Sequence, residues 1–448
     1  MQSVLLGLCL FISFLNIGVA ATSKDYDAIL AKYIDTQGPG VAAIVTKNGQ
    51  TLYLGTRGMA NVELGVPLKD DSVFRLGSIT KQFTAAAIML LQEQGRLSVS
   101  DNIHKYVPDF PTEGNTVTIK HLLTHTSGIA NYTEDQDIWN KHLKTPTTLD
   151  DMLKMFAKHP MALKTGEQNR YSNTGYVLLG KIIEVASGEK YADFIEKHIF
   201  AKLGMKNSRY GGNQLIPNRV SGYSMTDKGL ENAGHVDMMW PHAAGSLLST
   251  VDDLGIWFNA LTNGKFISKD SYHQMIQPFK LDDGTFAQYG YGLGLFRFNK
   301  YKAIGHGGGI HGFVTNAFYV PDEDLYVAVL QNLDSGSPGD IARLLAATAL
   351  NLDVPEFKTA DVDESILRPL MGTYYVDENS KRKISLENGQ VFSQRDDGQK
   401  WKIYPLSENS FYYEGSLSYF SIDTNDKGQS IMNFYHGLSL EPEVATKK

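Results

Sequence analysis

The chain has 448 residues, of which 42% are hydrophobic and 20% charged, a composition typical of a globular protein with two or three domains. Its net charge of −7 and the absence of any basic run argue against nucleic acid as a partner. The single cysteine is Cys9, so disulfides and cysteine chemistry are excluded for the rest of the chain.

Residues 1–20 are largely apolar and end in small residues, a pattern that predicts a secretory signal peptide cleaved after Ala20. Only the terminal amine supplies positive charge at the start, which leaves an uncleaved membrane anchor as the alternative. No later segment is long and apolar enough to span a bilayer. We therefore expect a secreted or periplasmic protein that contacts membrane only if this segment is retained.

The predicted main domain, residues 21–355, begins with an amphipathic helix over 24–36 and a hairpin whose strands, 41–45 and 51–54, meet at Asn48-Gly49. A long apolar helix then begins near Ser78 and stops at Gly95. Residues 98–280 read as a mostly helical insertion. The helices expected there cover 118–125, 148–158, 174–186, 191–202, 249–261 and 266–277.

Strands return after residue 291. Four short runs, at 293–296, 303–305, 317–320 and 326–330, predict an antiparallel meander, which a helix at 339–351 closes. Residues 364–440 alternate polar and apolar residues between turns such as Asn388-Gly389. They predict a small separate β-domain, either a barrel or a sandwich.

Ser78 is followed three residues later by Lys81, so a helix would place hydroxyl and amine on one face. A serine hydroxyl becomes a useful nucleophile only when a neighbouring base takes its proton, and the amine is a candidate base. The tetrapeptide alone is weak evidence, since Ser78 could equally be a helix N-cap.

Two further motifs carry chemical groups. Tyr171-Ser172-Asn173 precedes a predicted helix, where a phenol could relay a proton and an amide could orient a substrate carbonyl. The run 305–309, Gly-His-Gly-Gly-Gly, would let the backbone approach a substrate and leave its N–H groups uncovered. Taken singly, these motifs could also be a turn and a flexible loop.

A metal site is the competing interpretation. His121 and His125 are four residues apart in a predicted helix, a spacing used by zinc sites. No glutamate follows His121 and no third ligand is evident in the sequence. We expect neither a metal nor another cofactor.

In chain order, Ser78-x-x-Lys81, Tyr171-Ser172-Asn173 and His306-Gly307-Gly308 resemble the three signature motifs of the serine β-lactamase and penicillin-binding protein superfamily. Their spacing is similar to that of the class C β-lactamase and D-alanyl-D-alanine carboxypeptidase branch. The resemblance covers residues 25–350, and the tail from 364 resembles the lipocalin-like β-domain of some members. It implies an α/β fold: an antiparallel sheet flanked by helices, with a helical insertion and a C-terminal all-β barrel-like domain.

The resemblance also implies roles for individual residues. Ser78 would be the acyl-accepting nucleophile, while Lys81 and Tyr171 would share the work of general base and acid. Asn173 would position the substrate amide. Which of Lys81 and Tyr171 is the base stays open at this point.

The third motif would supply the substrate-binding strand through His306, Gly308 and Gly309. The backbone N–H groups of Ser78 and Gly309 would form the oxyanion hole, whose contribution is usually the largest in acyl transfer. A position near the start of a helix suits Ser78, because the helix dipole is positive there.

His306 departs from the family pattern, because class C β-lactamases and most penicillin-binding proteins have lysine there. An unperturbed histidine has a pKa of ~6.5, and the pKa of Lys81 must fall by about 3 for Lys81 to act as a base near neutral pH. A neighbouring ammonium would assist that fall and would hold the carboxylate of a penicillin better than a neutral imidazole does. We therefore expect a D-amino-acid peptidase, DD-carboxypeptidase-like or esterase activity on small molecules or peptides, cell-wall peptides among them. A class C-like β-lactamase and an inactive binding module are the alternatives; the oligomeric state is not indicated.

Overall fold

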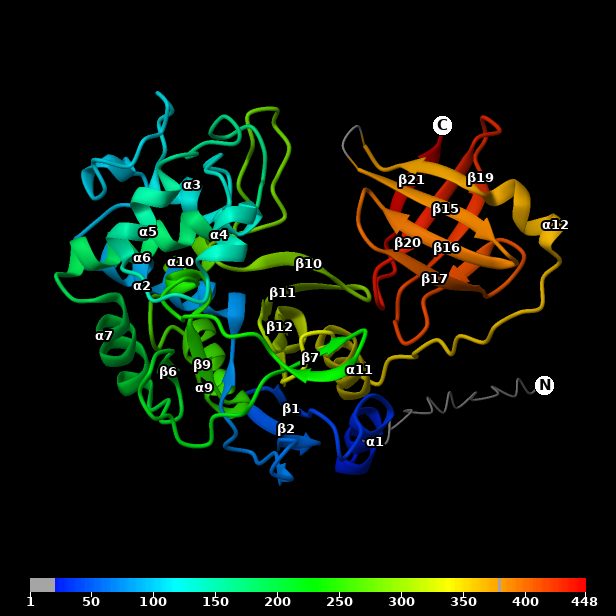
Figure 1. Ribbon diagram of the computed structural model, residues 1–448, viewed down its shortest axis with the longest axis horizontal. Coiled ribbons are helices and arrows are strands. Elements are labelled where there is room, and N and C mark those ends of the chain that lie inside the picture. Colours follow the sequence, from blue (N-terminus) through cyan, green and yellow to red (C-terminus); the bar gives the residue numbers. More distant parts are fainter. Residues whose placement is uncertain (1–20, 378–379) are drawn as a thin grey trace, which may run out of the picture.

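The computed structural model describes residues 21–377 and 380–448, so the predicted signal peptide lies outside it (Figure 1). A sheet-and-helix domain is followed by a separate β-barrel, and an extended linker joins them (Figure 1). Within the described ranges, no helix is long and apolar enough to cross a membrane. The predicted fold class, α/β with a C-terminal barrel-like domain, is confirmed.

The first domain is built on a six-stranded antiparallel sheet, in which the N-terminal hairpin extends the predicted meander. Its pairing follows the order β10-β11-β12-β13-β1-β2. The strands are β1 (Val41–Lys47), β2 (Gln50–Arg57), β10 (Gly294–Phe298), β11 (Tyr301–Ile310), β12 (Phe313–Val320) and β13 (Leu325–Gln331).

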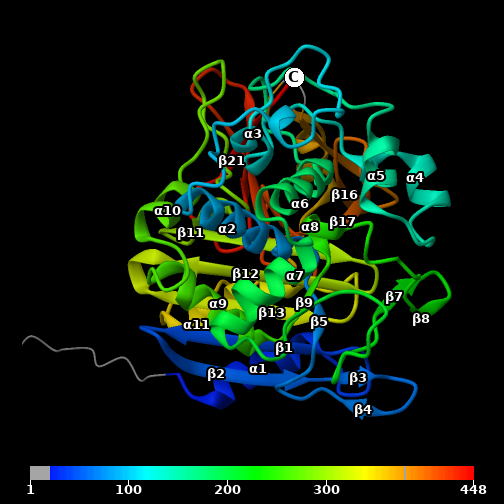
Figure 2. The same cartoon turned by 90° about the vertical axis from the view of Figure 1, so that its left-hand side faces the viewer.

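Both faces of this sheet are covered by helices, because its central strands are apolar on both sides. On β1, Val41, Ala43 and Val45 join one core, while Ala42 and Ile44 join the other. Helices α1 (Ser23–Tyr33) and α11 (Pro338–Ala349) cover the first face, and α9 (Val251–Thr262) covers the second. Figure 2 shows the helical region lying above the sheet on this second side.

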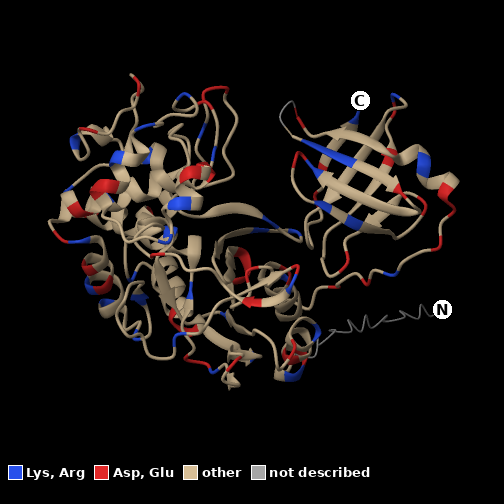
Figure 3. Ribbon diagram, viewed as in Figure 1, with Lys and Arg blue, Asp and Glu red and all other residues tan. Residues whose placement is uncertain are grey.

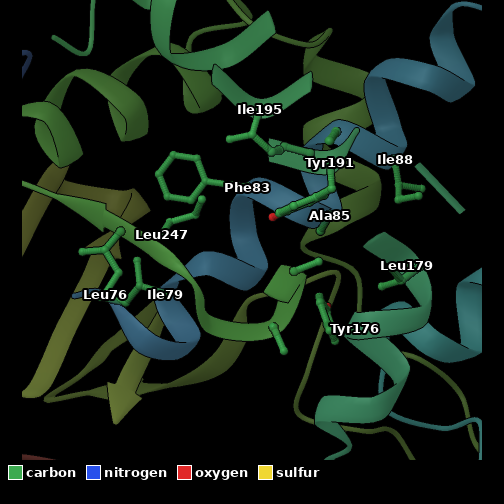
Figure 4. Packing of buried hydrophobic residues seen from close by; sticks show 14 of the residues in the cluster. Leu76, Ile79, Phe83, Ala85, Ile88, Tyr176, Leu179, Tyr191, Ile195 and Leu247 are labelled. Carbon is green, nitrogen blue, oxygen red and sulfur yellow. The ribbon is translucent and has the colours of Figure 1, made fainter. Parts of the chain in front are cut away.

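Helix α2 (Thr80–Glu93) runs through the middle of the larger core and is buried from Thr80 to Leu91. Its Phe83 side chain packs near Ile195 and Leu247, and α2 passes close to α6 and α8 (Figure 4). The small side chains of residues 85–87 permit that close approach. The helix is thereby held rigidly, together with the turn that precedes it.

The insertion between residues 98 and 280 contains the expected helices, together with two short helices, α4 and α8, and several strands that the sequence did not indicate. The helices are α3 (Ile119–Leu123), α4 (Gln136–Lys141), α5 (Leu149–Phe156), α6 (Asn173–Ser187), α7 (Tyr191–Ile195) with a π-helical extension (Glu196–Ala201), α8 (His242–Gly245), α9 and α10 (Lys269–Met275). The added strands are β6 (Arg209–Tyr210), β7 (Tyr223–Thr226), β8 (Gly229–Asn232) and β9 (Leu247–Ser249). The strand pair β6–β9 was missed because β9 also pairs with β5 (Phe74–Arg75), which is remote in sequence.

The tail is a closed barrel of eight antiparallel strands, which decides between the two predicted alternatives. It runs to Lys447, beyond the predicted limit of residue 440, because the last strand closes the barrel by pairing with both the first strand and β20. A pairing partner so distant cannot be read from the local pattern. The strands are β14 (Gly372–Tyr375), β15 (Lys381–Glu387), β16 (Gln390–Arg395), β17 (Lys400–Pro405), β18 (Ser410–Tyr412), β19 (Tyr419–Thr424), β20 (Ser430–Tyr435) and β21 (Glu443–Lys447).

The barrel docks on the first domain through a small apolar contact. Leu417 and Leu438, from barrel loops, are buried in the same cluster as residues of α1 and α11. A salt bridge of 2.6 Å between Arg297 and Glu441 also joins the two domains.

Candidate active site

Ser78 lies in a short 3₁₀ turn, Gly77–Ile79, just before α2 begins, rather than on α2 itself. The strand β11 presses against this turn: a Cβ on Gly308 would lie 2.0 Å from the Leu76 carbonyl oxygen, and one on Gly77 would lie 2.9 Å from the Gly309 nitrogen. Gly77 also has a φ of +55°, which favours glycine. The glycines therefore bring the nucleophile turn and β11 into contact.

The N-cap interpretation of Ser78 is wrong. Ile79 is the N-cap of α2 and no side chain caps it. The Ser78 hydroxyl instead meets two other polar groups, from Lys81 and Tyr171.

Lys81 is fully buried, and its Nζ lies 3.0 Å from Ser78 Oγ, 2.8 Å from Asn173 Oδ1 and 2.9 Å from the Ala244 carbonyl oxygen. No ion pair to Lys81 is found in the described part of the chain. Burial lowers the pKa of Lys81 well below its ordinary value. A neutral amine suits these contacts, because its two N–H groups can donate to the two carbonyl-type oxygens while its lone pair faces the Ser78 hydroxyl.

Tyr171 stands on the other side of the nucleophile, and its hydroxyl lies 2.8 Å from Ser78 Oγ. Burial raises the pKa of Tyr171 and outweighs the opposing effect of the Ser78 hydrogen bond. The phenol therefore stays protonated at neutral pH. Lys81 Nζ also lies 4.7 Å from the centre of the Tyr171 ring.

Asn173 opens α6, where Ser172 caps the helix by accepting a hydrogen bond of 3.2 Å from the Gly175 N–H. The cap fixes the position of Asn173, whose side-chain oxygen accepts from Lys81 while its amide nitrogen lies 3.4 Å from Thr133 Oγ1. This leaves the motif of residues 171–173 firmly placed rather than part of a mobile turn.

His306 lies in β11 and is turned towards Tyr289. Its Nε2 lies 2.8 Å from the Tyr289 hydroxyl and its Nδ1 lies 2.5 Å from the Gly307 carbonyl oxygen. Since a carbonyl only accepts, Nδ1 carries the proton and Tyr289 donates to Nε2. Burial, with a smaller effect of the Lys81 charge, lowers the pKa of His306 to about 4. His306, which stands where the resemblance led us to expect lysine, is thus electrically neutral near pH 7.

His125 and Tyr289 also belong to this neighbourhood. The buried ring of His125 lies 4.2 Å from the Tyr171 ring and 4.7 Å from the Tyr289 ring, measured between centres. Its Nδ1 accepts a hydrogen bond of 3.1 Å from the Ser172 N–H. The sequence named His125 only as a metal-ligand candidate, and nothing in it pointed to Tyr289.

The metal interpretation fails on the geometry of its helix. That helix ends at Leu123, so His125 lies beyond it with a φ of +56° rather than one turn from His121. His121 contacts the Thr118 N–H instead. In the described ranges, no three histidine, cysteine, aspartate or glutamate side chains gather in a way that could hold a metal ion.

A cavity of about 270 Å³ opens at Ser78 and Gly309, and we refer to it as the acyl cavity. Its walls combine apolar and aromatic side chains with polar groups, and its described lining includes no lysine, arginine, aspartate or glutamate. Trp139 is 42% exposed at its rim and stacks on His311, with ring centres 5.5 Å apart. The lining side chains are those of Ser78, Tyr132, Thr133, Trp139, Leu143, Asn173, Val236, Trp240, Pro241, Ala244, Ile310 and His311.

A second cavity, of about 530 Å³, lies beside Tyr171 and His306 and reaches the barrel, whose His436 and Ser439 line it. The barrel therefore forms part of the wall on the side of Ser78 where Tyr171 stands. The sequence left open whether the tail shapes substrate access or contacts a partner; in the structure the tail lines this second cavity, whose described lining does not include Ser78.

Comparison with known proteins agrees with this geometry. The model of the Beta-lactamase family matches residues 26–351, which is well over half of the chain. "Penicillin-binding protein 4*" of Bacillus subtilis (strain 168) is 30% identical over 431 residues, which cover 90% of this chain and 94% of that protein.

Solved structures give the same result. An octameric penicillin-binding protein homologue from Pyrococcus abyssi is 28% identical and has a TM-score of 0.67, covering 95% of this chain and 99% of that one. A D-stereospecific amidohydrolase from Streptomyces sp. is 26% identical with a TM-score of 0.64, covering 74% of this chain and 100% of that one. The chain therefore belongs to the β-lactamase family, whose members include serine hydrolases such as amidases and peptidases.

Proposed function

We propose that this protein is a serine hydrolase that works through an acyl-enzyme on Ser78. The observation that carries the proposal is the position of Ser78 Oγ, 3.0 Å from the Lys81 amine and 2.8 Å from the Tyr171 hydroxyl. One group is suited to take a proton and the other to give one, because burial disfavours the charged form of each.

The proposed reaction begins when neutral Lys81 takes the Ser78 proton while Oγ attacks the substrate carbonyl carbon. The backbone N–H groups of Ser78 and Gly309, which both line the acyl cavity, would stabilise the oxyanion. Tyr171 gives its proton to the leaving nitrogen or oxygen as that bond breaks, and Lys81 then returns a proton to Tyr171. Water releases the acyl group by the reverse sequence.

We propose D-amino-acid peptides and amides as the substrates, with simple esters as alternative acyl donors. The similarity to the D-stereospecific amidohydrolase from Streptomyces sp. supports the first class. The acyl cavity has no described acidic residue to pair with a free α-ammonium, so it favours N-acylated substrates. Asn173 and Thr133, on its wall, are suited to hold the amide of the acyl side chain.

Efficient β-lactamase activity is the weaker candidate. His306 is neutral, and the acyl cavity has no described cation to hold a penicillin carboxylate. A kcat/KM of about 10⁶ M⁻¹s⁻¹ for a penicillin would contradict this ranking. The inactive binding module is disfavoured by the intact arrangement of Ser78, Lys81 and Tyr171.

The test is the intact mass of the protein after exposure to a fluorophosphonate and, separately, to a penicillin. We expect a fluorophosphonate adduct at Ser78 and none in Ser78→Ala. Paired D- and L-configured N-acyl peptide amides then test the substrate class, and we expect faster hydrolysis of the D series. Absence of any adduct would leave only a binding function.

We also propose that the protein is exported and meets cell-wall peptides outside the cytoplasm. Support comes from the apolar segment at residues 4–19 and from the small residues that follow it. Fractionation of cells that express the full chain, followed by N-terminal sequencing, tests this proposal. A mature protein that begins at Ala21 is the expected result.

A further inference from the structure

We propose that a cleft next to the acyl cavity binds an anionic group, a carboxylate or a phosphate, at the far end of the substrate's acyl portion. The cleft, which we call the arginine cleft, is lined by Arg75, Arg219, His235 and His311, and has a volume of about 330 Å³. This inference rests on the proposed function, since it assigns a further feature to the substrate of the same site.

Backbone pairing sets the two arginines side by side. Residues 73 and 219 form a parallel bridge, in which the Val73 N–H donates to the Asn218 carbonyl oxygen at 2.9 Å and the Val220 N–H donates to the Val73 carbonyl oxygen at 3.1 Å. Arg75 is also fixed by the strand pairing of β5 with β9. The nearness of the like charges shows in the pKa of Arg75, which burial and then the Arg219 charge lower from its ordinary value.

Neither guanidinium has a protein counter-ion. Among the described residues, neither Arg75 nor Arg219 forms a salt bridge or a side-chain hydrogen bond; Arg75 only approaches the Phe313 ring, with its guanidinium carbon 5.8 Å from the ring centre. Elsewhere acidic and basic residues are interspersed over both domains (Figure 3), and several arginines are paired. Arg75 is half-buried and Arg219 is exposed, so water can solvate both groups in the absence of a ligand. Each guanidinium carries five N–H donors, and two unpaired ones in one concave site can together bind an anion.

The nearby acidic residues accept hydrogen bonds from other groups, and none that the structure describes forms an ion pair with Arg75 or Arg219. Asp334 accepts hydrogen bonds from the Ser224 hydroxyl and from the Gly312 N–H. Asp237 lines an adjoining cavity that Arg75 and Arg219 share, and it accepts a hydrogen bond of 2.9 Å from the Met239 N–H. The cleft itself is lined by no acidic residue of the described chain.

His311 joins this cleft to the catalytic site, because it lines both the arginine cleft and the acyl cavity. It follows directly after β11, the strand that carries Gly309. A substrate whose carbonyl lies at Ser78 can therefore place its acyl chain along the acyl cavity, whose described lining carries no Lys, Arg, Asp or Glu, so that the far end of the chain reaches past His311. An anion there would meet two guanidinium groups that can bind carboxylate or phosphate oxygens in pairs.

The test uses p-nitrophenyl monoesters of straight-chain dicarboxylic acids of increasing length. Each is matched with the ester of a methyl-ended acid of the same chain length. We expect kcat/KM for the acid-ended esters to pass the matched neutral esters at one length and to peak there. The length at the peak measures the span from Ser78 to the cleft.

Two variants test whether the two arginines cause the preference for acid-ended esters. Arg219→Gln should cut the preference for the acid-ended ester by about 10- to 100-fold, the usual effect of losing hydrogen bonds to a charged group, and should leave the neutral ester unchanged. Arg75→Lys keeps the charge but loses the paired donors, so it should cut the preference by a smaller factor. Arg96→Gln, just beyond the C-terminal end of α2, is the control and should not change kcat/KM for either ester.

Inhibition by inorganic phosphate tests whether the arginine cleft binds the anionic end of the substrate or a separate, free anion. We expect phosphate to inhibit hydrolysis of the acid-ended ester competitively while leaving a short neutral ester unaffected, and to lose this effect in Arg219→Gln. Phosphate that stabilises the protein without competing would overturn the assignment to the substrate. An unchanged preference in both arginine variants would overturn the site. Failure of the proposed function is separate from either result, since it would appear as no Ser78-dependent hydrolysis of the neutral esters.

Discussion

The catalytic site and the arginine cleft, which are joined at His311, each contain cationic residue types without an acidic partner, but the residues differ in charge state. At the catalytic end, Lys81 is fully buried without an acidic partner, and burial depresses its pKa. In the arginine cleft, Arg75 and Arg219 have no acidic partner either, but a guanidinium keeps its proton at any ordinary pH. The same lack of a counter-ion thus produces a neutral base in one place and an open anion site in the other.

Lys81 is fully buried, whereas Arg75 is half-buried and Arg219 exposed, so the charge state follows both from the residue type and from the degree of burial. A lysine can respond to burial by losing its proton and gaining the lone pair that proton abstraction requires. An arginine cannot, so its charge has to be met by water or by a ligand.

Loss of the base should have the largest effect. Lys81→Met removes the amine while keeping an unbranched, apolar side chain in its buried place. We expect kcat/KM to fall by roughly 10³- to 10⁴-fold, and equally for acid-ended and neutral esters, because proton abstraction is common to both. Steady-state kinetics checks this, with thermal unfolding to verify that the variant is folded. A fall in kcat/KM confined to acid-ended esters would show that Lys81 acts on the anionic end of the substrate and not as the base.

The pH profile should show where Lys81 titrates. Activity on a neutral ester requires neutral Lys81, so kcat/KM should rise with pH, by about tenfold per unit below the pKa of Lys81, and then level off. Because burial lowers that pKa, the rise should end well below pH 10. His306, with a pKa of about 4, should add no step near neutrality. If kcat/KM were still rising at pH 10, the pKa of Lys81 would not be lowered.

Trp139→Ala should open the rim of the acyl cavity. We expect KM for long acyl chains to rise by about tenfold, the scale of losing part of one aromatic contact, with little change in kcat. The shift should be the same for acid-ended and neutral chains. Acetyl esters, too short to reach Trp139, serve as the control substrates.

Salt should have the smallest effect and should act on the arginine cleft alone. Raising ionic strength from about 0.05 to 0.5 M should lower the preference for the acid-ended ester a few-fold, since screening weakens partly exposed charges. Neutral esters should be insensitive, because their reaction involves no exposed charge. Equal salt effects on both esters would indicate a general change in the protein.

The sequence predicted the sheet, the central helix and the meander, because their hydrophobic periods are set locally. It also predicted the residues around Ser78 through three motifs that are separated in the chain. The Ser172 cap that positions the start of α6 is local, but what brings Tyr171 and Asn173 to Ser78 and Lys81 is tertiary, as is the contact of β11 with the nucleophile turn. These tertiary contacts link residues about ninety or more positions apart, and no local pattern encodes them.

The electrostatics could not be predicted in the same way. The sequence suggested that His306, in place of lysine, would deprive Lys81 of help in losing its proton. The structure supplies the help through burial instead, which depends on α6 and α8 packing over Lys81. The arginine cleft was invisible for a similar reason, since Arg75 and Arg219 meet only through pairing of distant segments.

The closing strand of the barrel has a consequence for synthesis on the ribosome. Helix α11 ends at Ala349, whereas β21, which seals the barrel against β14, ends at Lys447. At ~5–20 residues per second, roughly 5–20 s separate the emergence of the two segments. During that interval the part of the α1–α11 surface that Leu417 and Leu438 cover in the folded protein has no barrel to pack against.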